Sequence, residues 1–254
     1  MERLIADLPV VTGPDWQGVR YFCTTRAGGV GVAPHDTLNL GLRAEDNPEA
    51  VAENRRRVRA AVPADPLWLR QVHGSEVVDA DAADVPAEPA VDASVTAQPG
   101  RVLAVMVADC LPVVIADTEG KVLGAAHAGW RGLSGGVLEN TLAAMRAKAP
   151  AAGGFRAWVG PGIGPRHFEV GQDVLDAFTA DDPATVRFFT ARPGVAGKWL
   201  ADLAGLADFR LRRAGVQEVV LSGECTMTRA DRYFSYRRDG VTGRMAMLAW
   251  LHPV

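Results

Sequence analysis

The chain has 254 residues, of which 48% are hydrophobic and 22% are charged, so it is long enough to bury a substantial core. Its formal net charge of -3 at pH 7 excludes the basic surface with which proteins hold nucleic acid through its phosphates. The longest apolar stretch, from Val102 to Ala116, is interrupted by Asp109 and Pro112, and we therefore expect no membrane span.

Apolar runs in the chain predict strands, and the nearly continuous run at 102–107 predicts a strand that is covered on both faces. The predicted strands are Val19–Thr24, Leu67–Val72, Val102–Val107, Val113–Asp117, Val122–Ala126, Phe155–Val159, Glu218–Ser222 and Met245–Leu251.

Helices are predicted from Pro48 to about Val62 and at Ser134–Lys148, Gln172–Thr179 and Leu200–Ala214. Asn47 is placed to cap the first helix, and Gly215 to end the last. The segments Ala80–Pro99 and Thr190–Lys198 are predicted loops, and neither is long enough to link two domains, so we expect one domain over residues 1–254. Strands and helices do not alternate strictly, which favours an α/β (α+β) fold with a mixed sheet.

The N-terminal segment has no long apolar run, so the sequence shows no secretory signal. The cysteines Cys23, Cys110 and Cys225 are odd in number, which favours reduced thiols over a disulfide framework. Together these features predict a cytoplasmic protein.

His73, Cys110 and His127 each follow a short apolar run and lie in loops rich in small residues, RQVHGSE, VMVADCLP and AAHAGWRG. Taken singly, Cys110 would be a small core residue and His73 equally well a structural imidazole. Their shared context at strand ends favours convergence in space. Two imidazoles and one thiolate suit zinc, with a fourth position left open for water or substrate, as in catalytic sites.

Several glycine-rich loops carry arginines that could bind an anion. Arg131 lies among four glycines after His127, and Arg26 lies in CTTRAGGVG. Arg238 lies in YFSYRRDG, where aromatic and arginine side chains could stack on a base or bind phosphate. For any one such loop, an ordinary turn with a capping or surface arginine is the more common case.

Six blocks of the chain, in this order, resemble the YfiH family, also called polyphenol-oxidase or laccase domain proteins and purine nucleoside phosphorylases. The blocks are TTRAGGV with LNLG, QVHG, ADCLPV, AAHAGWRG, GPGIGP with FEVG, and YFSYRRDG with TGRMA. The resemblance implies two mixed β-sheets sandwiched between helices. It also implies a metal site on His73, Cys110 and His127.

The resemblance further implies phosphorolysis of adenosine, inosine and S-methyl-5'-thioadenosine, together with deamination of adenosine. The expected partners are therefore purine nucleosides and phosphate, and the expected cofactor is zinc, or copper. Zinc lowers the pKa of water toward about 7, which suits deamination. We assign catalysis to Asp109 as proton carrier, Cys110 and Arg131, and substrate binding to Arg26, Asn39 and Arg238. The block around Arg166 and His167 differs from many relatives, so we assign no role to either residue from the resemblance.

The sequence is also compatible with three other functions. A multicopper laccase needs on the order of ten histidines for its copper sites, whereas the chain has five, so only a single-site copper polyphenol oxidase is compatible. A second alternative is an amide hydrolase acting on a peptidoglycan precursor, with zinc or with Cys110 as nucleophile. A third is a structural zinc site, to which Cys23 or Cys225 would supply the fourth ligand.

Overall fold

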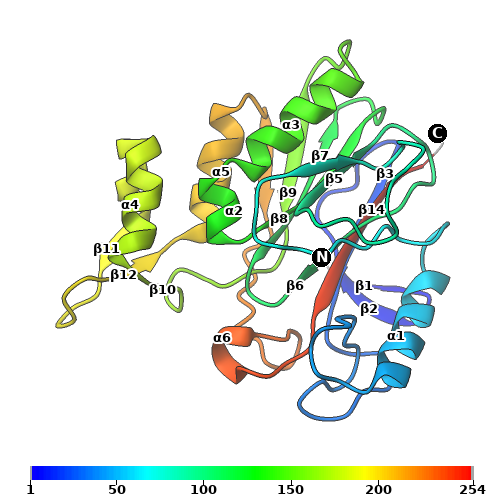
Figure 1. Cartoon of the computed structure of the whole chain (residues 1–254), viewed down its shortest axis with the longest axis horizontal. Helices are drawn as coiled ribbons and strands as arrows, with labels where there is room; N and C mark the ends of the chain where they lie inside the picture. Colours follow the sequence, from blue (N-terminus) through cyan, green and yellow to red (C-terminus); the bar gives the residue numbers. More distant parts are fainter. Residues whose placement is uncertain (1, 253–254) are drawn as a thin grey trace.

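The computed structural model describes residues 2–252 and contains two large sheets packed face to face (Figure 1). The five-stranded sheet is antiparallel throughout, in the order β1-β2-β3-β14-β6. Its strands are β1 (Glu2–Ile5), β2 (Leu8–Val11), β3 (Val19–Thr24), β14 (Met245–Leu251) and β6 (Leu103–Val107).

The six-stranded sheet is mixed, in the order β13-β9-β7-β8-β5-β4. Its outermost pairs, β13 with β9 and β4 with β5, are parallel, and the inner pairs are antiparallel. Its strands are β13 (Glu218–Leu221), β9 (Phe155–Val159), β7 (Leu111–Asp117), β8 (Leu123–Ala128), β5 (Ala93–Thr96) and β4 (Val77–Asp79).

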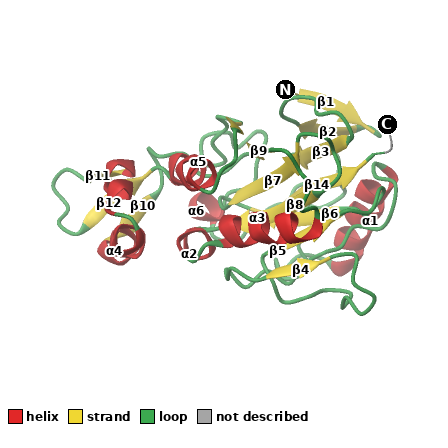
Figure 2. Cartoon of the chain, turned by 90° about the horizontal axis from the view of Figure 1, so that it is seen from above, coloured by secondary structure: helices red, strands yellow, loops and turns green. Residues whose placement is uncertain are grey.

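Helices cover the outer faces of this sandwich, as Figure 2 shows from above. The helix α1 (Pro48–Ala60) packs Val58 on Phe22 and Leu248 of the five-stranded sheet. On the other side, α3 (Val137–Lys148) and α5 (Leu203–Arg213) cover the six-stranded sheet. Between the sheets lies a core that includes Tyr21 and Trp158. The expected α/β fold with sheets between helices is therefore confirmed, with parallel pairs of strands, among the described residues, only in the six-stranded sheet.

A smaller three-stranded antiparallel sheet, β10-β12-β11, extends from one side of the body (Figure 1). It consists of β10 (Glu169–Gly171), β12 (Lys198–Ala201) and β11 (Phe189–Ala191), with α4 (Gln172–Asp181) and the 3-10 helix η1 (Pro183–Phe188). The remaining helices among the described residues are short: α2 (Trp130–Ser134) and α6 (Tyr236–Asp239). Within residues 2–252, no helix is both long enough and apolar enough to cross a bilayer.

The predicted strand at Leu67–Val72 is wrong. Only Leu67 forms a bridge, with Leu103 of β6. Further along, the side-chain amide of Gln71 replaces the backbone: its Nε2 donates to the carbonyl of Met106, and its Oε1 accepts from the Met106 N–H, both at 2.8 Å. The Gln71 side chain thus makes the hydrogen bonds that a neighbouring strand would make with Met106 of β6. The backbone at Gln71 can therefore turn into the loop that carries His73.

Other differences lie at element boundaries. The predicted helix at 134–148 begins only at Val137, as α3, because Gly136 takes a left-handed φ of 89° and separates α3 from α2, which ends at Ser134. The predicted helix at 200–214 begins at Leu203, because residues 198–201 form β12 and Asp202 accepts from the N–H of Gly205.

The predicted loop at 80–99 contains β5. The predicted loop at 190–198 connects β11 with β12. The cap by Asn47 is confirmed, since its side chain accepts from Glu49 and Ala50.

Candidate functional site

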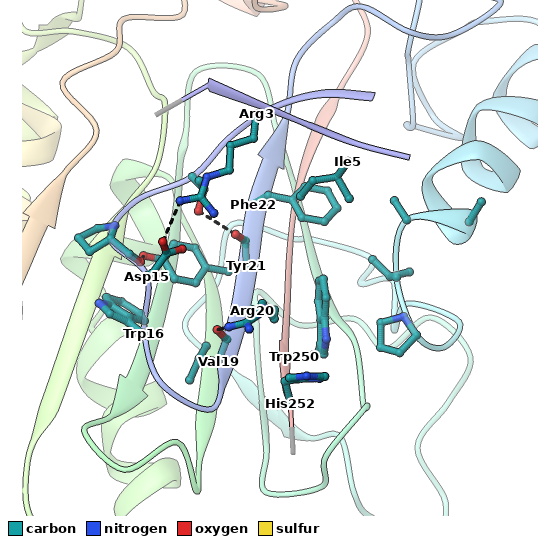
Figure 3. Close-up of a pocket in the computed structure, with 16 residues that line it drawn as sticks. Arg3, Ile5, Asp15, Trp16, Val19, Arg20, Tyr21, Phe22, Trp250 and His252 are labelled. Atoms are coloured by element: carbon teal, nitrogen blue, oxygen red, sulfur yellow. Dashed lines mark hydrogen bonds and ion pairs between the residues drawn. The ribbon is translucent and has the colours of Figure 1, made fainter. Parts of the chain in front are cut away.

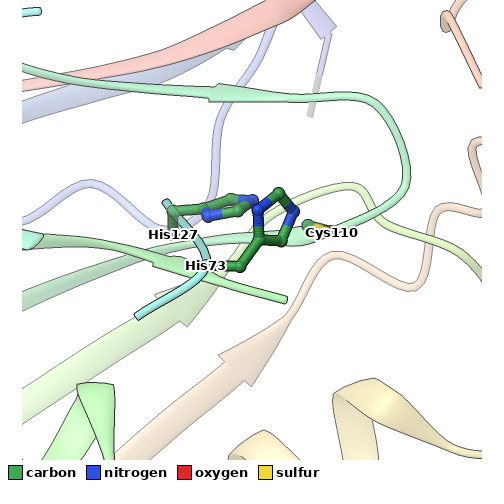
Figure 4. A group of neighbouring side chains, drawn as sticks. All are labelled: His73, Cys110 and His127. Atoms are coloured by element: carbon green, nitrogen blue, oxygen red, sulfur yellow. The ribbon is translucent and has the colours of Figure 1, made fainter. Parts of the chain in front are cut away.

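The structure brings His73, Cys110 and His127 together (Figure 4). Their ligand atoms all lie within 4.8 Å of one another, and the two imidazole rings are 4.9 Å apart with an interplanar angle of 80°. His127 is a buried residue of β8, and Cys110 immediately precedes the neighbouring strand β7. Because these strands pair Pro112 with His127, the turn before β7 places Cys110 beside the histidine.

Asp92 connects the two histidines and was missed in the sequence. Its Oδ1 accepts from Nδ1 of His127 at 2.8 Å and from the N–H of His73 at 3.0 Å. The residue is fully buried. It lies in the segment 80–99, whose Ala, Asp and Pro content favours a loop, and the short strand β5 that follows it contains only two β-branched residues, Val95 and Thr96, so the sequence gives little signal there.

Cys110 and His127 each shift the pKa of the other toward the charged form. Burial would raise the pKa of the Cys110 thiol, but the charge of His127 and hydrogen bonds with both imidazoles lower it to about 6. Burial likewise opposes protonation of His127, but Cys110 and Asp92 together raise its pKa. Without a metal, the site therefore favours a thiolate beside an imidazolium. A thiolate is the form of cysteine that binds metals and acts as a nucleophile.

Gly129 allows the three ligands to pack closely. A Cβ atom at this position would lie 2.9 Å from Sγ of Cys110, 3.1 Å from Cδ2 of His73 and 3.7 Å from Cε1 of His127. The glycine in HAGW thus keeps space for the ligands. Gly132 serves the same region, because a Cβ there would lie 2.5 Å from the carbonyl oxygen of Gly74.

We expect Gly129→Ala to weaken metal binding, because the new methyl group must displace at least one ligand. Overpacking of this kind costs about 1–3 kcal/mol. Gly153→Ala is the matched control, since nothing lies within 4 Å of a Cβ at that position. Metal content measured after equal exposure to zinc should fall only for Gly129→Ala; equal zinc content in both variants would contradict this account of Gly129.

The cluster opens into a pocket of about 490 Å³. This size suits a small organic molecule. Three arginines, Arg43, Arg237 and Arg244, line the pocket together with Asp109. Its apolar lining includes Leu42, Leu69, Met106, Ile163, Phe168 and Tyr236.

Of the pocket arginines, Arg244 is half-buried and, in the part of the chain that the structure describes, has donors without a partner. Its Nη1 donates to the carbonyls of Thr242 and Gly243, at 2.8 and 3.0 Å, and within residues 2–252 no hydrogen bond engages its Nε or Nη2. Arg43 instead forms an ion pair with Glu88. Arg237 also leaves Nε and Nη2 without a hydrogen bond among the described residues, but its side chain is exposed and its Nη1 donates to the carbonyls of His167 and Glu169. Arg244 is therefore the best placed of the three to bind an anion.

The arginines predicted from the sequence lie outside this lining. Arg26 donates to Asp36 and to the carbonyl of Ala230. Arg238 donates to several backbone carbonyls and to Asp239. Arg131 is exposed on α2, with its guanidinium 4.3 Å from the ring centre of Trp130. The catalytic role of Arg131 and the substrate-binding roles of Arg26 and Arg238 remain predictions.

Asn39 stabilises part of the backbone that forms the pocket wall. It is fully buried, and its Oδ1 accepts from the N–H groups of Gly41 and Arg244, at 2.9 and 2.8 Å. Its Nδ2 donates to Asp46 at 3.0 Å. Asn39 thus fixes the backbone of two lining residues, whereas direct contact with a substrate remains a prediction.

Asp109 lines the pocket beside Cys110, and both of its carboxylate oxygens have partners in the chain. Oδ1 accepts from the hydroxyl of Thr226 at 2.6 Å, and Oδ2 accepts from the N–H of Arg237 at 2.7 Å. The residue has a left-handed φ of 95°, and these bonds hold the turn that presents Cys110. Its role as proton carrier remains a prediction.

The other two cysteines are separate from the cluster. Cys23 is buried in β3, and Cys225 is half-buried, with its Sγ accepting from the N–H of Gly164 at 3.2 Å. Among the described residues, the metal-ligating group contains only His73, Cys110 and His127. A site with three protein ligands is typical of a catalytic metal rather than a structural one.

A second cavity, of about 440 Å³, lies between the start of the chain, the end of α1 and the end of β14 (Figure 3). It is lined by aromatic side chains, among them Trp16 and Trp250, and by the ion pair of Arg3 with Asp15 at 2.9 Å. Among the residues that the structure describes, its lining contains a single histidine, His252, and no cysteine. The chemistry suited to catalysis is therefore in the first pocket.

Known proteins resemble the chain over nearly its whole length. The family model described as multi-copper polyphenol oxidoreductase laccase matches residues 20–252. Purine nucleoside phosphorylase YfiH of Escherichia coli (strain K12) is 45% identical, covering 94% of this chain and 97% of that protein. A purine nucleoside phosphorylase of Pseudomonas aeruginosa is 46% identical, with the same coverage.

Solved structures agree with these relatives. A crystal structure of a Neisseria meningitidis protein has a TM-score of 0.87 and 45% identity, covering 96% of this chain and 98% of that one. The structure of YlmD from Geobacillus stearothermophilus also has a TM-score of 0.87, with 29% identity, covering 97% and 96%. The chain therefore belongs to the family described as multi-copper polyphenol oxidoreductase laccase, the YfiH family, several of whose curated members are named purine nucleoside phosphorylases.

Proposed function

We propose that the chain is a zinc-dependent purine nucleoside phosphorylase, acting on adenosine, inosine and S-methyl-5'-thioadenosine, with adenosine deamination as a second activity. The observation that carries the proposal is the His73–Cys110–His127 cluster, which opens into a pocket that also contains Arg244, whose Nε and Nη2 have no hydrogen bond among the described residues. The names of the curated relatives support the reaction class.

The donor set fits zinc. Imidazole and thiolate are common zinc ligands, and three protein ligands leave the open position that a catalytic site needs. A multicopper oxidase would require several further histidines near the cluster. The chain has five histidines in all, and within the described residues only two of them belong to the cluster. This counts against copper-dependent polyphenol oxidation as the main activity.

The pocket residues provide what phosphorolysis requires of a protein. The apolar side chains of Leu42, Met106 and Phe168 offer surface for a purine base. The guanidinium of Arg244 offers a planar pair of donors that matches phosphate oxygens. A zinc ion bound here would act as a Lewis acid on a substrate oxygen or on water. Asp109, at the pocket wall, is the carboxylate we propose to carry protons.

Cleavage of an amide by Cys110 is the competing function. It is favoured by the low pKa of the Cys110 thiol, of about 6, and by the adjacent His127. The two functions differ in their response to zinc, because a thiolate that ligates a metal is not available as a nucleophile. Added zinc would therefore inhibit an amidase and support a phosphorylase.

We expect inosine to yield free hypoxanthine only in the presence of phosphate, because the phosphate oxygen is the nucleophile that replaces the base. Chromatography of inosine incubated with the zinc-loaded protein, with and without phosphate, measures this. Ribose 1-phosphate should form in an amount equal to the base. Equal release of base without phosphate would show a hydrolase instead.

A further inference from the structure

Asp92 is bonded to both loops that carry the histidines of the cluster. Its Oδ2 accepts from the N–H groups of Val72 and Gly74, at 3.0 and 2.7 Å, and its Oδ1 accepts from the N–H of His73. On the other side, the same Oδ1 accepts from Nδ1 of His127. One carboxylate therefore holds three consecutive backbone donors and one imidazole.

The backbone at His73 depends on these bonds. His73 has a left-handed φ of 61°, which is uncommon for a residue with a side chain. Its N–H and those of both neighbours converge on Asp92, so the turn is stabilised by one buried anion. Without the carboxylate, three backbone donors would lose their partner and the His73 side chain would lose its fixed direction.

The ring of His127 is oriented by the same residue. A neutral imidazole has one N–H, and Nδ1 of His127 lies 2.8 Å from the carboxylate, which favours the proton on Nδ1. Nε2 then keeps its lone pair for a metal. The backbone adds a second tie, because the N–H of His127 donates to the carbonyl of Asp92 at 2.7 Å.

We propose that Asp92 is the positioning residue that preassembles the metal site, by fixing the His73 loop and the His127 ring relative to each other. The inference rests on the metal site of the proposed function, and it is independent of the purine reaction. Partners of this kind in other metal proteins change metal affinity by about 10–100-fold when they are mutated.

Asp117 provides a matched control inside the same chain. It is also fully buried, and its carboxylate also accepts from three backbone N–H groups, those of Glu119, Lys121 and Val122, at 2.6–3.1 Å. It lies at the far end of β7 from Cys110 and bonds no histidine. A purely structural role for Asp92 would make the two aspartates equivalent.

The test compares Asp92→Asn with Asp117→Asn in the full chain, with zinc affinity measured by competition against a chromogenic chelator. In each variant a neutral amide replaces the carboxylate, so the negative charge is lost and an NH₂ donor takes the place of one acceptor oxygen. Both variants should therefore unfold at a lower temperature than the wild type. We expect zinc affinity to fall about 10–100-fold for Asp92→Asn only. The thiolate–cobalt absorption of the cobalt-loaded protein should change in the same variant.

Wild-type zinc affinity and an unchanged cobalt spectrum in Asp92→Asn would overturn the proposal, as would an equal loss of affinity in Asp117→Asn. If Asp92→Asn does not fold, Asp92→Glu serves in the same measurements, because it keeps the charge and moves the carboxylate by one methylene. Wild-type protein that does not bind zinc would overturn the metal site itself. Zinc binding without purine cleavage would overturn only the proposed reaction.

Discussion

Cys110→Ala is expected to lose nearly all bound zinc and the phosphorolysis that depends on it. The wild type should contain about one zinc per chain, held by three ligands. The variant leaves only the imidazoles of His73 and His127, and it removes the negative charge that attracts the cation. Elemental analysis of purified protein, with the phosphate-dependent assay on the same samples, measures both effects. Full zinc content in Cys110→Ala would refute the ligand assignment.

Cys225→Ala is the control for this experiment. Like Cys110, Cys225 is half-buried, but its Sγ accepts from Gly164 and does not belong to the cluster. The variant should keep its zinc and its activity. Loss of zinc in Cys225→Ala would instead support a structural site with four ligands.

The convergence of His73, Cys110 and His127 was predictable because strand ends and loops of small residues are visible in a sequence. Each apolar run marked a strand or a segment beside one, and a glycine or alanine lies within two residues of each ligand. The helices α1 and α3 were also predictable, from caps and from apolar residues at helical spacing. These signals are local, so they survive without knowledge of the tertiary structure.

What the sequence did not reveal depends on contacts between distant segments. Asp92 acquires its importance only when the turn at His73 and the strand of His127 meet around it. Gln71 replaces a strand by bonding Met106, which lies 35 residues further along the chain. Short strands such as β4 and β10 have only three residues each and form through pairing with a neighbour, so their own sequences carry little signal.

The prediction about Arg131 shows the same limit. Its glycine-rich loop and its distance of four positions from His127 favoured an anion site. In the structure two of these glycines, Gly129 and Gly132, make room for the ligands and for Gly74, and Arg131 stacks on Trp130 outside the pocket lining. Arg244, in the TGRMA block, lines the pocket instead, because Asn39 holds its backbone there.

Arg244→Lys is therefore expected to raise the KM for phosphate about 10- to 100-fold, which corresponds to the roughly 1.5–3 kcal/mol of a hydrogen bond to a charged group. Lysine keeps the positive charge but cannot present the paired donors of a guanidinium. Arg131→Lys is the matched comparison, since it makes the same chemical change on an exposed side chain. We expect zinc content and the KM for inosine to stay near wild type in both variants. A raised phosphate KM in Arg131→Lys, with a normal value in Arg244→Lys, would return the anion site to the glycine-rich loop after His127.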